Sequence, residues 1–145
     1  MRASSVLARR IGTAFDDGIG GPGGWWIVIE PEIHLGSDVV VPDIAGWRRE
    51  TMPEYPAGPA VEMPPDWVCE VVSPRTAALD RVKKLPRYAQ SLVRHAWIID
   101  PASRTLEVYS LAGEHYSLIE TFEAEEVGRG EPFEAIELRL SDLWL

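Results

Sequence analysis

The stretch that most constrains the fold is the apolar run from Trp67 to Val72, which a single acid, Glu70, interrupts. The run is rich in β-branched residues and is bounded by Pro65 and Pro74, so it predicts a strand covered on both faces, as in the middle of an α/β sheet. Glu70 is then expected inside the protein. A buried carboxylate is costly unless a cation, a proton or hydrogen-bond donors satisfy it. Glu70 therefore needs a partner that a surface glutamate would not need.

Length and composition favour one domain. The chain has 145 residues, 46% of them hydrophobic, which is enough for a single core over residues 1–145 and too little for two. The sequence shows neither the apolar block of a signal peptide nor an apolar stretch of membrane-spanning length. The lone cysteine, Cys69, lies in the apolar run and cannot form an internal disulfide, which fits a reducing cytosol. We therefore expect a cytoplasmic protein, with no membrane partner, in which Cys69 is a small core residue.

Charge is distributed unevenly along the chain. The net charge of −9 argues against a non-specific nucleic-acid binder, because such proteins usually present basic surfaces to phosphates. Between Arg75 and Arg94, however, six basic residues stand against one acid, Asp80. From Glu107 to Asp142 the balance reverses, with ten acids against two arginines. A polyanion could therefore be met only locally, on the basic segment.

Hydrophobic periodicity predicts the order helix, strand, strand, strand, helix, strand, followed by antiparallel strands. The helices are expected over residues 2–15 and Thr76–Leu92. The expected strands are Trp25–Ile29, Val39–Trp47, Trp67–Val72, His95–Asp100, Thr105–Leu111 and His115–Phe122, with Phe133–Leu140 and a terminal turn closing the chain. On the second helix, the residues expected to face the core are Ala78, Val82, Leu85, Ala89 and Leu92.

Three segments allow more than one interpretation. Residues 18–24 formally contain G-x-G-x-x-G, but a helix precedes them and a strand follows, which is the reverse of a dinucleotide-binding loop and favours a turn. Glu30, Glu32 and His34 alternate, so they could hold a metal or form a solvated face. Residues 48–65 carry five prolines, and such a long connection could be a lid over the acidic residues or a cover for the sheet edge.

A second acid, Asp43, lies inside the apolar strand expected over Val39–Trp47. On a helical projection at about 100° per residue, Lys84 falls at the margin of the core-facing side, on the same edge as Arg81 and Tyr88. Lys83 points to solvent on the same projection. One interpretation is structural, with Asp43 bonded to loop amides and Glu70 paired with Arg81 or Lys84, since ion pairs perturb acids without catalysis.

Four motifs, taken in their order along the chain, can be compared with a known protein family. They are Pro42-Asp43, the strand with Glu70, the helix segment with Lys84 and Tyr88, and residues 97–101 (WIIDP). In these motifs the sequence resembles the Uma-two family of predicted restriction endonucleases, which belongs to the PD-(D/E)XK nuclease fold group. The resemblance implies a restriction-endonuclease-like α/β fold, with a central mixed β-sheet flanked by helices and extra C-terminal antiparallel strands.

The same resemblance implies a chemistry, namely Mg²⁺- or Mn²⁺-dependent cleavage of DNA. Asp43 and Glu70 match the two metal-binding acids, and the main-chain carbonyl of Val71 would complete an oxygen site of the kind Mg²⁺ prefers. Lys84 would position the attacking water or stabilise the transition state. Tyr88 and Arg81 would lie next to these groups and hold them in position.

The sequence departs from the family pattern in two places. Val72 stands where the motif lysine is expected, so we assign that charge to Lys84 on the helix, with Lys83 as the fallback. Family members usually carry a further helix and hairpin before the segment that resembles residues 2–15, so we expect an N-terminal segment to be lacking. The alternative function is a catalytically silent interaction domain that acts through protein contacts, with the acidic C-terminal strands forming a homodimer.

Overall fold

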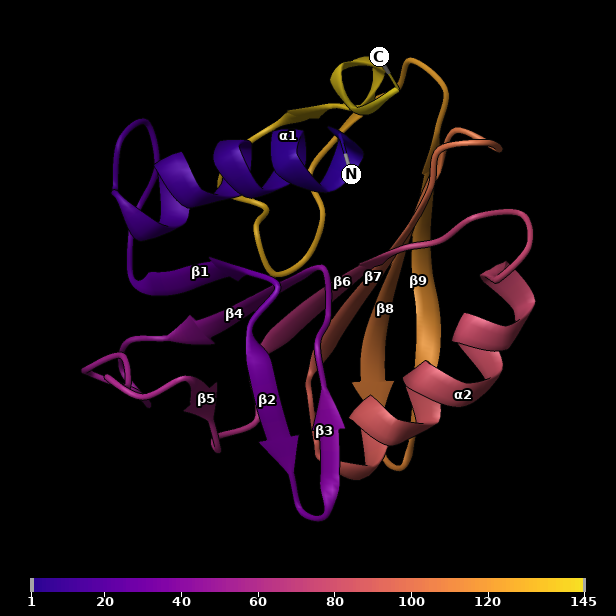
Figure 1. Cartoon of the computed structure of the whole chain (residues 1–145). Helices are drawn as coiled ribbons and strands as arrows, with labels where there is room; N and C mark the ends of the chain where they lie inside the picture. Colours follow the sequence, from indigo (N-terminus) through magenta and orange to yellow (C-terminus); the bar gives the residue numbers. More distant parts are fainter. Residues whose placement is uncertain (1, 145) are drawn as a thin grey trace.

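The apolar run around Glu70 forms strand β6 (Trp67–Val71), which lies in the middle of a six-stranded sheet. The computed structural model describes residues 2–144 and orders this sheet β1-β4-β6-β7-β8-β9 (Figure 1). Strands β6 and β7 are parallel, whereas the other neighbours are antiparallel. The bounds of the other strands are β1 Trp25–Ile29, β4 Ile44–Arg48, β7 His95–Asp100, β8 Thr105–Ala112 and β9 His115–Glu123. The fold class is therefore the mixed α/β sheet that the sequence predicts.

One face of the sheet is covered by the two ends of the chain. Helix α1 (Arg2–Ile11) continues into a π-helical turn, η1 (Gly12–Asp16), and together they place Leu7, Ile11 and Phe15 in the core. The C-terminal segment lies on the same face and contains β10 (Val127–Gly128), β11 (Leu138–Arg139) and η2 (Leu140–Leu143). Its central residue is Phe133, whose ring contacts those of Phe15, Trp25, Trp67 and Trp97.

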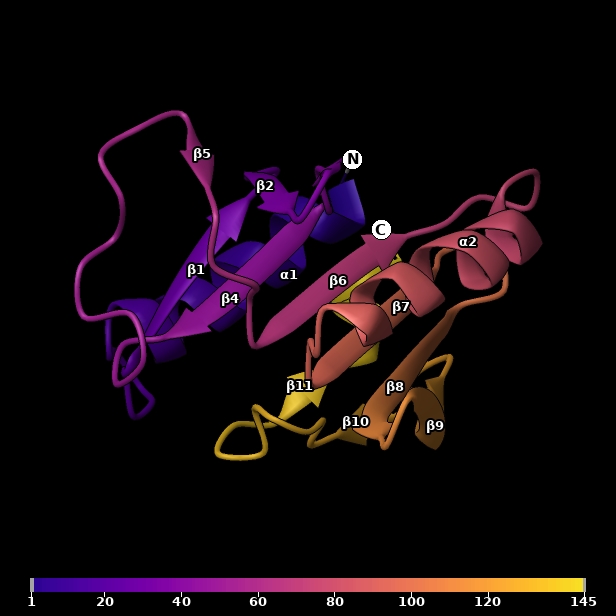
Figure 2. The same cartoon turned by 90° about the horizontal axis from the view of Figure 1, so that it is seen from below.

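The other face is covered by helix α2 (Ala77–Gln90) and a small three-stranded sheet (Figure 2). The small sheet has the order β3-β2-β5, with β2 over Glu32–Leu35, β3 over Asp38–Val40 and β5 over Ala60–Val61. Apolar residues of both elements and of the large sheet form the second core cluster, which includes Ile33, Trp47, Val68, Tyr88 and Ala96. None of the helices within residues 2–144 is long and apolar enough to cross a membrane.

The single strand expected over Val39–Trp47 is wrong, because the chain leaves one sheet and enters the other within it. β3 pairs with β2, ends at Val40, and β4 begins at Ile44 to pair with β1 and β6. Pro42 stands in the break, where its missing N–H costs no ladder hydrogen bond. Asp43 therefore directly precedes β4, and the expectation that it lies inside a strand is corrected.

The core-facing side expected for the second helix is wrong in part. Val82 is 72% exposed and Leu92, which lies beyond the end of α2, is 71% exposed, while Ala78 is exposed as well. Ala89 is buried and Leu85 packs against the second core cluster, as expected, and Tyr88 is buried as well. The helix is thus rotated so that the edge with Tyr88 meets the sheet, for reasons that the site explains.

The proline-rich segment 48–65 covers an edge of the small sheet. Its strand β5 pairs parallel to β2, which extends that sheet by one strand. The carbonyl oxygens of Met52 and Met63 accept hydrogen bonds from the indole N–H groups of Trp26 and Trp47, at 2.8 and 2.9 Å. Of the two interpretations of this segment, edge cover is the one that these contacts support.

Candidate active site

Two acids meet where β4 joins β6. Ile44 is the register partner of Cys69 in this antiparallel pair, so the preceding residue, Asp43, lies opposite Glu70. Side chains at opposed positions point to the same face with Cβ atoms about 5 Å apart. Asp43 Oδ2 also accepts a hydrogen bond of 2.7 Å from the backbone N–H of Val71. The structure therefore brings together the three positions from which the sequence predicts a metal site.

Glu70 receives its partners from α2, as the cost of a buried carboxylate requires. Its residue is 5% exposed. Tyr88 donates its hydroxyl proton to Oε1 at 2.7 Å, and Lys84 Nζ donates to Oε2 at 3.0 Å. Lys84 and Tyr88 are four residues apart and lie on one helical face. Lys84 is thus the lysine that faces the sheet, as the helical projection predicts, while Lys83 is exposed.

The electrostatics of the site place two carboxylates in mutual repulsion. Burial raises the pKa of Glu70, and the hydrogen bond from Tyr88 and the charge of Lys84 only partly offset this, while the charge of Asp43 raises the pKa further. For Lys84, burial lowers the pKa, but the charge and hydrogen bond of Glu70, with the charges of Asp80 and Asp43, outweigh it and raise the pKa. The ammonium form of Lys84 is therefore favoured.

The donor set fits a hard divalent cation. A carboxylate offers about four acceptor positions, of which the described residues use two on Glu70 and one on Asp43. The remaining acceptor positions are lone pairs on carboxylate oxygens, and such oxygens are ligands that suit Mg²⁺. A cation bound there would relieve the repulsion between the two acids. No group of three or more acidic, histidine or cysteine side chains within residues 2–144 could hold a metal alone. A cation there would therefore need oxygen ligands besides the two carboxylates, such as water.

The alternating acids of β2 do not provide a second metal site. His34 Nε2 lies 2.9 Å from Oε2 of Glu32 in an exposed pair. Glu30 precedes β2 with a φ of 48°, so the extended alternation that would have aligned it with these two residues is broken. The metal interpretation of Glu30, Glu32 and His34 is therefore wrong, and a solvated face remains.

Arg81 lies near the site but faces a different acid. Its Nε donates to Oε1 of Glu107 at 2.9 Å and its Nη2 lies 2.8 Å from the same oxygen, to which the hydroxyl of Tyr109 also donates at 3.0 Å. Glu107 is not among the residues that the sequence predicts for the site. The sequence signal that could have identified Glu107 is the alternation of polar and apolar residues in β8. This alternation puts Glu107 and Tyr109 on one face of the strand, and it puts Leu106 and Val108 in the core on the other face.

Comparison with known proteins points to one family and one fold. The family Uma2, described as "Putative restriction endonuclease", matches residues 2–141. Among solved structures, the chain is similar to one whose title is "Crystal structure of a putative nuclease belonging to DUF820" from Anabaena variabilis ATCC 29413. The two share 20% sequence identity with a TM-score of 0.74, and the match covers 99% of this chain and 81% of that one. The similarity supports the restriction-endonuclease-like fold. A comparison with curated proteins gave no match.

Proposed function

The chain belongs to the Uma2 family, and from this premise we propose that it hydrolyses phosphodiester bonds of DNA in a reaction that depends on Mg²⁺ or Mn²⁺. The observation that carries the proposal is the opposition of Asp43 and Glu70, with Lys84 hydrogen-bonded to the second acid. Carboxylates that a like charge and burial perturb, with a lysine beside them, are candidates for a functional site.

Each residue has a role that follows from its position. Asp43 and Glu70 would hold the cation, together with the carbonyl of Val71. When bound, such a cation lowers the pKa of a water ligand and offsets charge that develops on the phosphate. Lys84 keeps its proton on Nζ and presents a positive charge beside Glu70 for the developing charge of the transition state. Tyr88 fixes the orientation of Glu70 by donating to Oε1.

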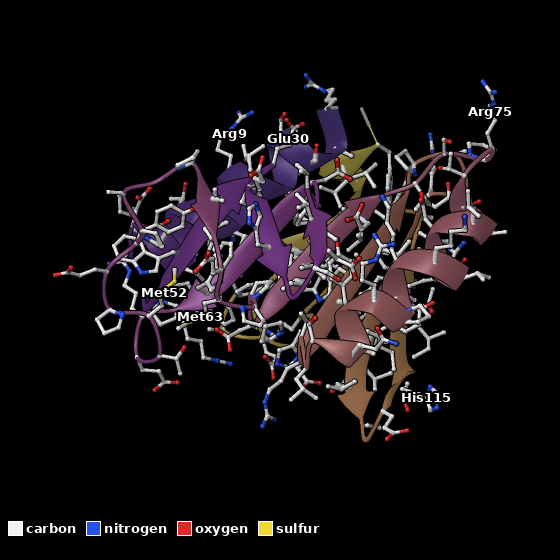
Figure 3. The ribbon with its side chains drawn as sticks, turned by 60° about the horizontal axis from the view of Figure 1, so that its bottom comes forward. Arg9, Glu30, Met52, Met63, Arg75 and His115 are labelled. Carbon is white, nitrogen blue, oxygen red and sulfur yellow. The ribbon has the colours of Figure 1, made fainter. Side chains whose placement is uncertain are left out.

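The basic residues around α2 supply a place for the flanking phosphates. Arg75, at the start of the helix segment, projects away from the body of the protein in Figure 3 and is exposed, as is Lys83. Cations of this kind contact the nucleic-acid backbone without reading its sequence. Because the chain carries a net charge of −9, such contacts would be confined to this region, and binding would weaken as the salt concentration rises. The lone buried Cys69 supports a cytoplasmic setting.

The proposal is tested by metal binding and cleavage together. Titration calorimetry with Mg²⁺ and Mn²⁺ should show binding to the wild-type chain that is lost in both Asp43→Asn and Glu70→Gln. The same variants should lose cleavage of a double-stranded plasmid by at least about 100-fold, as expected when an essential charge is removed. Lys84→Ala should lose cleavage but retain metal binding, with Lys83→Ala as the matched control. Cleavage that survives in Glu70→Gln would refute the assignment.

A catalytically silent interaction domain is the second candidate. Val72 occupies the position of the motif lysine, and the edge strand β9 exposes two apolar side chains, Leu118 at 50% and Ile119 at 42%. An open strand edge of this kind can pair with another chain. Sedimentation of the purified chain distinguishes the two candidates. A homodimer that Ile119→Lys dissociates, in a chain that binds neither metal nor DNA, would favour the interaction domain.

A further inference from the structure

The ion pair between Arg81 and Glu107 lies beside the candidate site without belonging to it. We propose that this pair, together with Tyr109, is a positioning element that holds the first half of α2 so that Lys84 reaches Glu70. The proposal rests on the proposed function only in that Lys84 is taken as a catalytic residue.

The sheet places the two acids in one row. Glu70 is the register partner of Ile98 on β7, and Ile98 is the register partner of Glu107 on β8. All three side chains therefore point to the α2 face, and the acids are separated by one strand, with their backbones about 10 Å apart at the usual strand spacing. Ile98 between them is 1% exposed. The carboxylates of Glu70 and Glu107 thus lie at fixed positions on either side of β7, and we call them the two anchors.

The helix meets both anchors with one edge. Arg81 and Lys84 are three residues apart, so their side chains lie on neighbouring turns of the same face, separated along the axis by about 4.5 Å. Arg81 donates from Nε to Oε1 of Glu107, its Nη2 lies 2.8 Å from that oxygen, and the hydroxyl of Tyr109 donates to the same oxygen. A charge-assisted hydrogen bond from the planar guanidinium to a carboxylate has a defined direction as well as a defined distance. Its position therefore constrains where the next turn can lie.

Apolar packing does not anchor this half of the helix. Leu79 is 53% exposed and Val82 is 72% exposed, and the buried residues of α2 are Tyr88 and Ala89 near its C-terminal end. Lys84 itself has a long flexible stem, and its side chain is 42% exposed. Without Arg81 on Glu107, the first turns of α2 would be free to move away from the sheet. Lys84 would then lose its fixed distance to Glu70.

Lysine labelling tests this geometry independently of any activity. The chain contains only two lysines, Lys83 and Lys84, so reductive methylation followed by mass spectrometry reports on these two amines besides the N-terminus. In the wild-type chain we expect Lys84 to react several-fold more slowly than exposed Lys83, because Glu70 engages its amine. In Glu107→Gln we expect the two rates to converge, while the matched variant Glu120→Gln, on exposed β9, keeps the wild-type ratio.

A charge swap separates positioning from general stabilisation. In the double variant Arg81→Glu with Glu107→Arg, the pair is restored in reverse, so the slow labelling of Lys84 should return. If the wild-type chain cleaves DNA, Glu107→Gln should lower kcat by roughly 10- to 100-fold with little change in KM, as misplacement of a catalytic group does. Lys84 that stays protected in Glu107→Gln, whatever the melting temperature, would overturn the proposal. A wild-type chain that cleaves nothing would refute the proposed function, yet the labelling ratio would still decide the positioning.

Discussion

The two faces of the large sheet are held by different kinds of contact. On the α1 face, three fully buried aromatic residues, Trp67, Trp97 and Phe133, pack against one another with ring centroids 4.8 to 5.7 Å apart. On the α2 face, the first half of the helix is held by the pairs of Lys84 with Glu70 and Arg81 with Glu107, while its apolar side chains remain in solvent. We call the first the dry face and the second, where these ion pairs lie beside the second core cluster, the charged face.

This difference separates stability from position. Burial of aromatic side chains is worth several kcal/mol each but is non-directional, since it depends on area removed from water. Partly exposed ion pairs contribute only about 0–1 kcal/mol each, yet their hydrogen bonds fix distance and direction. We infer that the α1 face supplies most of the folding free energy, whereas the α2 face uses part of its contacts to place groups for chemistry. The predictions below test this division.

The largest expected effect is a truncation on the dry face. Phe133 is fully buried and touches four aromatic rings, so Phe133→Ala leaves a cavity that its neighbours cannot fill. We expect a loss of about 3–5 kcal/mol in the free energy of unfolding, measured by urea denaturation with Lys84→Ala as the reference on the charged face. Equal losses in the two variants would break the division.

Acid should act oppositely on the two faces, and His95 provides the larger response. Burial, with the charges of Arg48 and Arg94, lowers the pKa of His95 from 6.5 to about 4, against a weaker opposing effect of Glu134. Its Nδ1 lies 3.9 Å from Glu131, too far for a hydrogen bond, and accepts none from the described residues. The ring is therefore neutral in the folded protein and takes a proton more readily when unfolded.

Because the folded pKa of His95 is the lower one, stability is lost as pH falls from about 6.5 to about 4. The loss should reach about 1–3 kcal/mol, at 1.4 kcal/mol per unit of pKa difference. Denaturant midpoints across this range should show it in the wild-type chain, and His95→Gln should flatten the profile. For Glu70 the pKa is raised, so its contribution is present at acid pH and is lost as pH rises through the folded pKa. Glu70→Gln should therefore remove only the loss of stability that accompanies rising pH.

A smaller effect is expected from Tyr88→Phe, which removes one donor from Glu70 and keeps the ring in the core. We expect a loss of about 1.5–2 kcal/mol near neutral pH, in the lower part of the range for a hydrogen bond to a charged group. The hydrogen bond holds the pKa of Glu70 down, so its loss raises that pKa further. The loss in free energy of unfolding should therefore grow with pH. Denaturant midpoints measured at acid and at neutral pH can show this growth. In a Glu70→Gln background the same substitution should cost less and show no such growth.

Local pattern predicted much of this arrangement. The strands β1 and β6 to β9 follow from apolar runs and alternation within single segments, and each is confirmed. The expectation that Glu70 is buried and partnered needed only its own strand, and it is confirmed as well. The helical projection also placed Lys84 on the edge that faces the sheet. These features depend on neighbours close in sequence, which a single chain displays directly.

What the sequence could not predict depends on distant pairing. The break at Pro42 exists because β3 pairs with β2 in one sheet and β4 with β1 and β6 in another. The contact of α2 with Glu107 joins residues 26 positions apart, Arg81 and Glu107. Because Val82 is exposed, the folded state lacks about 1.5–3 kcal/mol of stabilisation that burial of this side chain would contribute. Leaving the carboxylates of Glu70 and Glu107 without donors would destabilise the folded state by more. The charged partners therefore outweighed the apolar periodicity of the helix.

The smallest expected effect tests that rotation directly. Val82 on α2 and Val68 on β6 both stand on the α2 side of the sheet, but Val82 is 72% exposed and Val68 is 1% exposed. Replacement of valine by threonine conserves shape and changes helix propensity little, so the two substitutions differ mainly in whether a hydroxyl is buried. We expect Val82→Thr to change the free energy of unfolding by less than about 0.5 kcal/mol. Val68→Thr should cost about 1–3 kcal/mol. If the two variants lost the same amount, α2 would pack with the side that apolar periodicity predicts, and the charged row on Glu70 and Glu107 would not set its orientation.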